Sequence, residues 1–399
     1  MKVAYITMQF PVPSETFASW DVESLRKQGC EVSVYCMRPK SPAFGELVRE
    51  RGHSDIAISH FSWTSLGGGL TYSFRHPLVV INLLGWVVSC CFRSPKHLFK
   101  SLVLFPSVIS IFRFLFEKKP DVVHLFWGHY PAMVGYLVDK YMPGTVLSMF
   151  LGAHDLISAY PGSVKLSRNV NAIFTHSRAN LEALSAMGID VAKVHVVARG
   201  IKLDFPVLSS VKKFYDLQNP VFLAAGRLIE DKGFDDVLRV FKNILRAHPS
   251  AVLKIAGDGP FRSRLVCMTG ELKIERSVYF LGHLDQLSLV TLMSEAHFFL
   301  LMSRHPSERL PNVVKEAMFQ KCIVLTTKTP GVDELVESGV TGYIVEKGDC
   351  NSASQYVLSC LQKTECLVAM ACAANSFVGK GFNVDVSMAR YIDYWRAGE

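Results

Sequence analysis

The sequence predicts an α/β protein with two doubly wound parallel sheets. Strand-like apolar segments alternate with helix-like segments along both halves of the chain, a pattern typical of parallel sheets covered by helices. The 399 residues, 49% of them apolar, suffice for two domains with separate cores. Periodicity lapses between 201 and 220. We therefore predict Rossmann-like domains over 1–205 and 215–380. The tail 381–399 indicates a last helix, for which packing back on the first domain is one alternative.

The first half is expected to form six strands, of which the first begins almost at the N-terminus. Helices are expected from about Glu15 and over 179–187, between strands rich in β-branched residues. The strand segments are 3–8, 31–36, 122–126, 146–150, 172–175 and 194–197.

The second half repeats this alternation with shorter spacers. Its predicted strands are 221–224, 252–256, 278–281, 298–302, 323–326 and 343–345. Its predicted helices are 234–247, 261–269, 284–296, 311–319 and 332–336, the fourth opening on a proline that suits a first helical turn.

Segment 61–120 combines apolar runs with positive charge. The runs 78–92 and 98–116 are interrupted and shorter than the roughly 20 residues that a membrane span needs. Two interpretations stay open: docking on an anionic membrane surface, or core helices with solvated basic ends. Nucleic-acid binding is less well supported because few polar side chains accompany the basic residues of this segment. The segment holds one acid, Glu117, and seven basic residues: Arg75, Arg93, Lys96, Lys100, Arg113, Lys118 and Lys119.

The cysteines and the N-terminus indicate a cytoplasmic protein. The ten cysteines include no CxxC pair and no metal-ligand spacing, so reduced and mostly buried thiols are expected. Residues 1–7 read as a strand rather than a secretory signal. With the basic segment, the expected location is the inner face of the cytoplasmic membrane.

Two glutamates eight positions apart form the strongest local signal. Glu308 lies between the apolar run 298–302 and the helix that begins near Pro311, at the carboxyl edge of a predicted sheet, where ligands bind in open α/β folds. Glu316 is expected to face the same crevice from within that helix. Carboxylates accept several hydrogen bonds and therefore suit hydroxyl-rich ligands such as sugars. The alternative is an ordinary solvated helix start.

Three glycine-bearing turns follow strands: 226–233, 257–260 and 329–334. In the first, Gly226 allows close backbone approach while Arg227 and Lys232 supply two cations, which suits a diphosphate. In the second, Gly257 and Gly259 indicate a tight turn. None of the turns carries the GxGxxG fingerprint, and no Walker loop is present.

In the first half, two post-strand segments contain candidate binding residues. Ser14 is a natural N-cap, and Glu15 and Thr16 would then sit at the positive end of the first helix. His154 and Asp155 directly follow the strand 146–150. Both positions are typical of binding sites at a sheet's carboxyl edge, although a lone histidine is commonly structural.

Taken in order, these motifs resemble the retaining nucleotide-sugar glycosyltransferases of the GT-B fold, glycosyltransferase family four. The first half resembles a branch of bacterial exopolysaccharide and colanic acid biosynthesis, and the likeness covers nearly the whole chain except 45–120. The second-half motifs are Gly226-Arg227-Leu228, Lys232-Gly233, Ala256-Gly257-Asp258-Gly259-Pro260, Val278 to Gly282, Glu308 with Glu316-Ala317-Met318, Gly331 with Glu334, and Thr341-Gly342. The first-half motifs are Phe10-Pro11, Ser14-Glu15-Thr16-Phe17, Gly152-Ala153-His154-Asp155, Thr175-His176-Ser177 with Asn180, and Arg199-Gly200-Ile201.

The resemblance implies residue roles. Arg227 and Lys232 would hold the donor diphosphate and stabilise the leaving group. Glu316 would accept hydrogen bonds from the ribose and Glu308 from the transferred sugar, while His154 would face that sugar from the opposite domain.

Further roles follow from the same resemblance. Pro311, Asn312 and Val313 would lie against the distal phosphate. Retention would proceed by front-face attack with the donor phosphate as base, so neither a protein nucleophile nor a metal is expected, and no Asp-x-Asp motif is present. Retaining hydrolases differ, since they use two carboxyl groups about 5–5.5 Å apart.

Three positions depart from the family pattern. Arg309 stands where glycine is usual, beside the sugar pocket, while Lys321 and Ile323 replace a glycine and a proline after the helix. The donor sugar therefore does not follow from the resemblance.

The predicted function is transfer of a hexose from a nucleoside diphosphate sugar, most simply a UDP-sugar, to a glycan or polyprenyl-linked acceptor in surface polysaccharide biosynthesis. The expected partners are this donor, the acceptor and an anionic membrane, with no separate cofactor, no metal and no nucleic acid. Two alternatives stay open: a GT-B UDP-sugar epimerase, and a catalytically silent scaffold that binds nucleotide sugar. The sequence predicts neither linkage nor oligomeric state.

Overall fold

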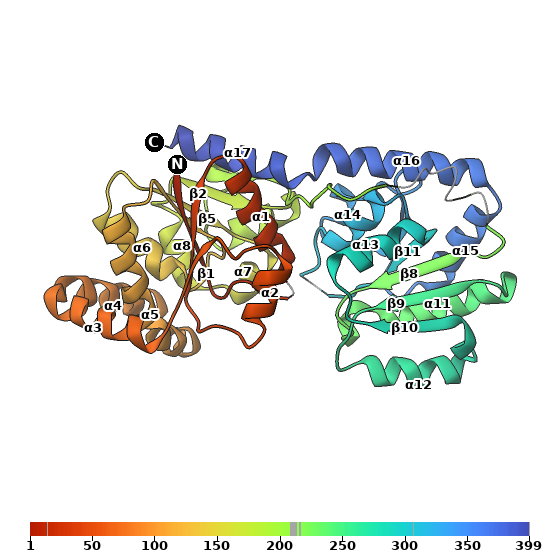
Figure 1. The fold of residues 1–399 in the computed structure, drawn as a ribbon, viewed down its shortest axis with the longest axis horizontal. Coiled ribbons are helices and arrows are strands. Elements are labelled where there is room, and N and C mark those ends of the chain that lie inside the picture. The colour runs from red at the N-terminus through yellow and green to blue at the C-terminus, as the bar shows by residue number, and fades with distance from the viewer. Residues whose placement is uncertain (14, 208–213, 215–216, 306, 399) are drawn as a thin grey trace. The chain divides into compact units, whose positions relative to one another are not determined.

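The computed structural model describes residues 1–13, 15–207, 214, 217–305 and 307–398. Ser14, one of the predicted binding residues, lies outside them. The chain forms two compact units, one of Met1–Gly200 with Val384–Glu399 and one of Ile201–Asn383 (Figure 1). Each contains one parallel sheet with helices on its faces, as the alternating pattern predicts.

The first unit contains seven parallel strands in the order β3-β2-β1-β4-β5-β6-β7. The order reverses at β1, so the carboxyl ends of β1 and β4 flank the position where doubly wound sheets hold ligands. All six predicted strands are present, and β3 is additional because its alternating, half-exposed sequence gives a weak apolar signal. The bounds are β1 (Lys2–Thr7), β2 (Glu31–Cys36), β3 (Ala57–His60), β4 (Val122–Leu125), β5 (Val146–Phe150), β6 (Ala172–Thr175) and β7 (Val194–Val196).

Helices cover both faces of this sheet. The predicted helix over 179–187 is shorter than expected, because a 3₁₀ turn, η1 (Arg178–Asn180), precedes α9 (Leu181–Ala186). The other helices are α1 (Thr16–Lys27), α2 (Phe44–Glu50), α3 (Trp63–Arg75), α4 (Pro77–Cys91), α5 (Pro95–Lys118), α6 (Ala132–Tyr141), α7 (Ala153–Ser158), α8 (Pro161–Leu166) and α17 (Val384–Ala397), with a second 3₁₀ turn, η2 (Val191–Lys193).

The C-terminal helix α17 belongs to the first unit. Trp395 is fully buried and its Nε1 donates to Ser148 Oγ at 2.8 Å. Tyr391 stacks on Phe174 with ring centroids 3.9 Å apart. These contacts attach the helix to the central strands β5 and β6.

The division between the units differs by a few residues from the predicted linker. It falls after Gly200 rather than within 205–215, and the return begins at Val384 rather than at 381. The reason is local pairing inside the second unit, where Ile201 N donates to Phe382 O at 2.8 Å and Ile201 bridges Asn383.

The second unit contains six parallel strands in the order β10-β9-β8-β11-β12-β13. All six were predicted, because each is a short apolar run bounded by turn residues. The bounds are β8 (Val221–Ala225), β9 (Val252–Ala256), β10 (Val278–Gly282), β11 (Phe298–Leu301), β12 (Ile323–Thr327) and β13 (Tyr343–Val345).

The helices of this unit differ from prediction at one place. The prediction of a helix over 332–336 is wrong, because only a 3₁₀ turn, η5 (Val332–Glu334), forms before the chain continues to β13. Two helices that had not been delimited, α15 and α16, complete the unit. The full set is η3 (Glu230–Lys232), α11 (Phe234–Ala247), α12 (Arg262–Leu272), η4 (Glu275–Ser277), α13 (Gln286–Glu295), α14 (Asn312–Phe319), α15 (Cys350–Leu361) and α16 (Thr364–Gly381).

The two apolar runs of 61–120 form α4 and α5, which lie with α3 in a layer beside α6 (Figure 1). Their inner faces are core, with Leu83, Phe112 and Leu115 fully buried. By length and composition alone, α5 is the one described helix that could cross a membrane, and up to three spans would exist if each bent helix pair counted as one.

Candidate functional site

The first glycine turn of the second unit packs directly on the second. Gly226 N donates to Ala256 O at 3.0 Å, and Leu228 N donates to Asp258 O at 2.9 Å. A Cβ on Gly257 would lie 1.9 Å from Gly226 O, and one on Gly259 would lie 2.4 Å from Leu228 O. These two glycines are therefore required for the backbones of the two turns to meet at the carboxyl edge of β8 and β9.

The same turn carries both predicted diphosphate ligands. Arg227 is exposed, and Lys232 ends the 3₁₀ turn η3. Gly233 then takes φ +67, and a Cβ there would lie 1.8 Å from Met302 O, at the end of β11. The close contact with β11 brings Lys232 next to the loop that follows that strand.

Lys232 forms an ion pair with Glu308, between Nζ and Oε2. Ser303 Oγ donates to the same carboxylate oxygen at 3.0 Å. The side chains of Lys232 and Glu308 are 24% and 13% exposed, so the pair is shielded but reachable from solvent. Two residues predicted from separate motifs, 76 positions apart, are thereby brought together.

The helix α14 begins next to this pair. Pro311 is its N-cap residue, and Asn312 and Val313 are half-buried in its first turn. Lys315, fully buried, donates from Nζ to Asn312 Oδ1 at 3.0 Å and lies 5.2 Å from the centre of the Phe382 ring. The amide end of α14 is thus positively polarised and reinforced by a buried ammonium group.

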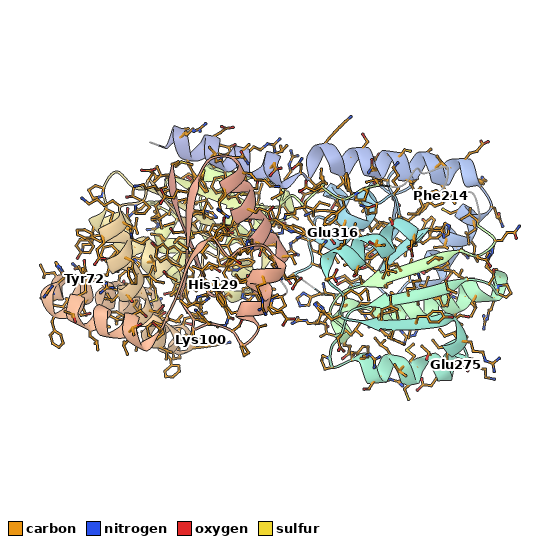
Figure 2. The ribbon with its side chains drawn as sticks, in the orientation of Figure 1. Tyr72, Lys100, His129, Phe214, Glu275 and Glu316 are labelled. Atoms are coloured by element: carbon orange, nitrogen blue, oxygen red, sulfur yellow. The ribbon has the colours of Figure 1, made fainter. Side chains whose placement is uncertain are left out.

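Glu316, within α14, is more buried than Glu308 in the preceding loop. It is 7% exposed, and burial raises its pKa to about 7, against the opposing effects of Gln286 and Lys315. The predicted pair of glutamates therefore has two different environments. Glu308 is held by a cation, whereas Glu316, which Figure 2 labels in the second unit, is buried and neighbours Gln286.

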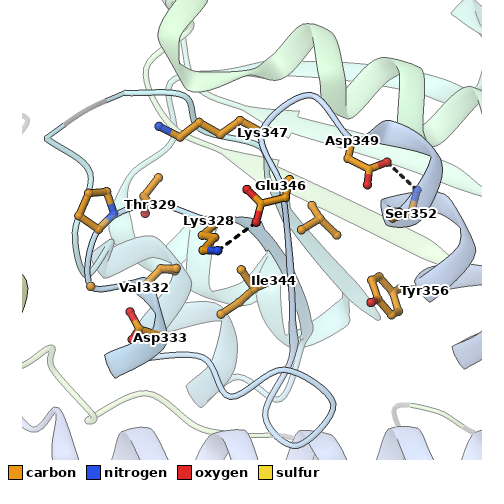
Figure 3. A pocket seen from close by; sticks show the side chains of 13 residues that line it. Lys328, Thr329, Val332, Asp333, Ile344, Glu346, Lys347, Asp349, Ser352 and Tyr356 are labelled. Atoms are coloured by element: carbon orange, nitrogen blue, oxygen red, sulfur yellow. Dashed lines mark hydrogen bonds and ion pairs between the residues drawn. The ribbon is translucent and has the colours of Figure 1, made fainter.

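A pocket of about 810 Å³ opens at the carboxyl ends of β12 and β13 (Figure 3). Thr329, Pro330 and Gly331, from the third glycine turn, line one wall. Lys328 and Glu346 form a 3.1 Å ion pair within it, and both are largely exposed. Lys347, also in the lining, donates to Arg304 O at 3.4 Å and so connects the pocket to the loop of Glu308.

In the first unit, Arg199 is the centre of an aromatic cluster. Its guanidinium carbon lies 4.4, 5.0 and 4.3 Å from the ring centres of Phe17, Phe126 and Phe150. Its Nε lies 3.9 Å from a carboxylate oxygen of Asp21. Cation–π contacts of this kind hold a guanidinium in a fixed orientation.

The predicted residue Glu15 belongs to this cluster. Burial raises its pKa, against the opposing effects of Arg199, Trp127, His129 and Arg51. It is the N-cap residue of α1, and the next predicted residue, Thr16, is the first in that helix.

Asp155 is buried, at 1% exposure, and orients its neighbours. Its Oδ1 accepts from His129 N at 3.1 Å and pairs with His129 Nδ1 at 2.9 Å, and its Oδ2 accepts from Gly152 N at 2.9 Å. Direct contact between Asp155 and substrate stays a prediction. What the structure contains is an Asp155–His129 pair that links the ends of β4 and β5.

His154 is exposed beside this pair, with its ring 5.5 Å from that of His129 and 5.9 Å from that of Trp127. Desolvation and the neighbouring His129 lower its pKa, against the effect of Asp155. Its role towards a donor sugar stays a prediction.

Comparison with known proteins decides the family. Residues 209–376, which include Arg227, Lys232, Glu308 and Glu316, match the sequence model of the family described as Glycosyl transferases group 1. This part of the chain is a Glycosyl transferases group 1 domain. The predicted family resemblance is thereby confirmed, while the retaining mechanism stays a prediction.

Two relatives of this glycosyltransferase extend the comparison over the whole chain. AmsK of Erwinia amylovora, an amylovoran biosynthesis glycosyltransferase, is 25% identical over 410 residues and covers 97% of both chains. WcaL of Salmonella typhimurium, assigned to colanic acid biosynthesis, is 22% identical over 384 residues and covers 88% of both.

The solved structure of HepE from Anabaena, in complex with UDP, superposes on the glycosyltransferase with a TM-score of 0.74. The identity is 18% and both chains are covered completely, so the likeness concerns the fold. It confirms the predicted GT-B fold.

Sequence reasoning missed two residues of the glycosyltransferase's first-unit cluster. Arg199 was quoted only as part of a motif and His129 was not selected, yet each follows a strand, β7 and β4, at the same sheet edge as Asp155. Post-strand position was therefore the signal that could have selected them. In the second unit Lys315 was missed, because a buried lysine has no sequence signature.

Among the described residues, no three His, Cys, Asp or Glu side chains lie together as a metal site would require. Metal independence of the transfer stays a prediction.

Proposed function

We propose that the glycosyltransferase transfers a hexose from a UDP-sugar, with retention and without a metal, to a glycan or polyprenyl-linked acceptor in surface polysaccharide biosynthesis. The observation that carries this proposal is the Lys232–Glu308 pair between the Arg227 turn and the start of α14. It combines cations for a diphosphate with a carboxylate for sugar hydroxyls. The names of AmsK and WcaL and the UDP-glucose complex of HepE support the polysaccharide and the donor.

In this proposal the bond between the sugar's anomeric carbon and the diphosphate oxygen breaks while the acceptor oxygen bonds to the same face. Arg227 and Lys232 compensate the charge that develops on the departing diphosphate. The proton of the acceptor hydroxyl moves to the diphosphate oxygen that leaves. Glu308 orients the sugar, and the first-turn amides of α14 hold the distal phosphate.

The first-unit cluster is the acceptor side of the proposal. Glu15 and the Asp155–His129 pair supply hydrogen-bond acceptors at one sheet edge, and the pair fixes which nitrogen of His129 faces the carboxylate. Trp127 acts on the Glu15 carboxyl through a side-chain hydrogen bond, and the Phe17 ring lies 6.4 Å from the Trp127 ring, so both add aromatic surface near Glu15. Such a surface suits the apolar face of a sugar ring.

The first test is thermal unfolding of the purified protein with UDP, GDP and ADP. A ligand bound only to the folded state stabilises it by about 2.7 kcal/mol at a hundredfold excess over its Kd. UDP is expected to raise the melting temperature, and Arg227→Ala to remove most of the increase. Arg276→Ala is the control, because Arg276 is exposed in η4, before the amino end of β10. Equal stabilisation of both variants, or none by any nucleotide, would contradict the proposed donor site.

Glu316 gives a prediction about pH. Its pKa is raised to about 7 in the folded state, so the folded protein binds more protons than the unfolded chain between about pH 4.5 and 7. Its contribution to stability therefore falls as pH rises through that window. The free energy of unfolding of Glu316→Gln, relative to that of wild type, is expected to rise by about 2 kcal/mol from pH 5 to pH 8. Urea unfolding at pH 5 and pH 8 measures this difference. If the free energies of unfolding of the variant and wild type change equally with pH, the pKa of Glu316 is not raised in the folded protein.

One observation favours a second candidate, a scaffold that binds nucleotide sugar without turnover. Arg309 is half-buried beside Glu308, where family members usually have glycine, and burial lowers its pKa. A bulky cation there would crowd the sugar. Turnover of a UDP-sugar in the presence of an acceptor extract excludes this candidate.

A further inference from the structure

The outer faces of α3, α4 and α5 are apolar and exposed. Phe74, Leu78, Ile81, Phe92, Phe99 and Val103 are between 62% and 86% exposed, with Phe74 the most, and we call these six the outer apolar face. Leu78 and Ile81 are three positions apart in α4, and Phe99 and Val103 are four apart in α5, so each pair shares one side of its helix. Phe74 lies near the end of α3, and Phe92 directly follows α4. The helices contact one another along this layer of the first unit (Figure 1). Apolar side chains gathered in this way mark an interaction surface.

Exposed cations accompany this face. Arg75, Arg93, Lys96 and Lys100 all lie at the ends of the three helices and are exposed. The acid of the region, Glu117, lies 3.8 Å from Arg113 and is thereby compensated. In the part of the chain that the structure describes, none of these four cations forms an ion pair, so the surface combines apolar side chains with uncompensated positive charge.

We propose that the outer apolar face docks on an anionic lipid bilayer, with α3, α4 and α5 lying in the plane of the interface. Phenylalanine and aliphatic side chains would enter the acyl region while lysine and arginine meet lipid phosphates, as in interfacial helices. A second copy of the chain fits less well, because two such faces in contact would oppose charges of the same sign.

The helices lie along the bilayer rather than across it because their other faces are already used. Val108, Phe112 and Leu115 of α5 are 0% exposed within the first-unit core, and crossing the membrane would remove them from it. The axes of α3 and α4 bend by 102° at their junction, which excludes one straight span.

Helix α5, which carries part of the outer apolar face, also contacts the segment next to the acceptor-side cluster. His97, at the start of α5, lies 3.0 Å by Nδ1 from the hydroxyl of Tyr130, the residue after His129. Figure 2 places Lys100 on the outer helices and His129 inside the same unit. If the proposed function holds, a membrane-anchored acceptor would be presented where α4 and α5 meet the bilayer. This position is near the Asp155–His129 pair.

The test is co-sedimentation of the full-length protein with vesicles of phosphatidylglycerol and phosphatidylethanolamine, and with vesicles of phosphatidylcholine. Wild type is expected to bind the anionic vesicles and to be released by about 0.5 M salt, because salt at this concentration screens the attraction between surface charges. The triple variant Phe74→Ser, Ile81→Ser, Phe99→Ser is expected to bind them at least about tenfold more weakly. The control variant is Val266→Ser, Leu287→Ser, Val340→Ser, which removes exposed apolar side chains of the second unit.

Lys96→Glu with Lys100→Glu provides a second arm in which no apolar residue changes, and it is expected to lose preference for anionic vesicles. Melting temperatures of all variants establish that they fold. Equal binding by the two triple variants, retention on vesicles through alkaline carbonate extraction, or a dimer that the first triple variant dissolves would each overturn the proposal. Vesicle binding needs neither donor nor acceptor, so its failure is distinguishable from failure of the proposed transfer reaction.

Discussion

Replacing Glu308 with Gln is expected to lower the transfer rate by roughly 100- to 1,000-fold, the range found when one preorganised electrostatic group is lost from an active site. The change keeps the shape of the side chain and removes its charge. Lys232 then loses its ion-pair partner, and Ser303 loses a charged acceptor. Lys232 would no longer be fixed beside the leaving group, and the sugar would lose a strong hydrogen-bond acceptor. Initial rates with a radiolabelled UDP-sugar and an acceptor extract measure the loss.

Glu295→Gln is the matched control. Glu295 also pairs with a lysine of the second unit, Lys254, at 3.5 Å, but its side chain is 53% exposed. Exposed pairs contribute little, so this variant is expected to keep its rate within about twofold. Equal rates for wild type and Glu308→Gln would contradict the proposed site and favour the scaffold. Formation of a new sugar nucleotide without any acceptor would identify an epimerase.

The fold was largely predictable because parallel strands buried on both faces leave short apolar runs. Phe298 to Leu301 is such a run, and the strand there matches the prediction within one residue. Strand β3 was missed because an edge strand such as Ala57–His60 buries only part of its surface and therefore carries a mixed sequence. The helix expected after Gly331 failed for a different reason. Its apolar spacing is helical, but the chain must return to β13 after only one turn.

The site was predictable where a backbone requirement fixed the residue. Gly257 and Gly259 are required by turn-to-turn packing, which a sequence reveals as a glycine pair after a strand. The partner of Glu308 was not predictable, because the 76-residue separation from Lys232 is closed only by the packing of Gly233 on Met302. The different environments of Glu308 and Glu316 were hidden as well, since burial depends on α13 and its Gln286.

The largest stability effect is expected from Trp395→Ala in α17. Trp395 is fully buried in the first unit, donates to Ser148 Oγ at 2.8 Å, and lies 5.5 Å from the His124 ring. Truncation of a large buried aromatic side chain costs about 3–5 kcal/mol, because the transfer free energy is lost and a cavity remains. Urea unfolding, monitored by circular dichroism, is expected to show that the first unit unfolds at a lower urea concentration than in wild type.

Arg396→Ala is the control for this variant, because Arg396 is the exposed neighbour on the same helix and its loss is expected to change stability by less than about 0.5 kcal/mol. The comparison tests how the C-terminus contributes to the fold. Ser24 Oγ donates to Asp385 at 2.6 Å, so the beginning of α17 is attached to α1 while Trp395 attaches its end to β5. If Trp395→Ala unfolds like wild type, α17 does not stabilise the first unit in solution. If it destabilises as expected, residues 384–399 are an integral part of the first unit, and truncating them would impair the Glu15 and His129 cluster through the sheet that carries it.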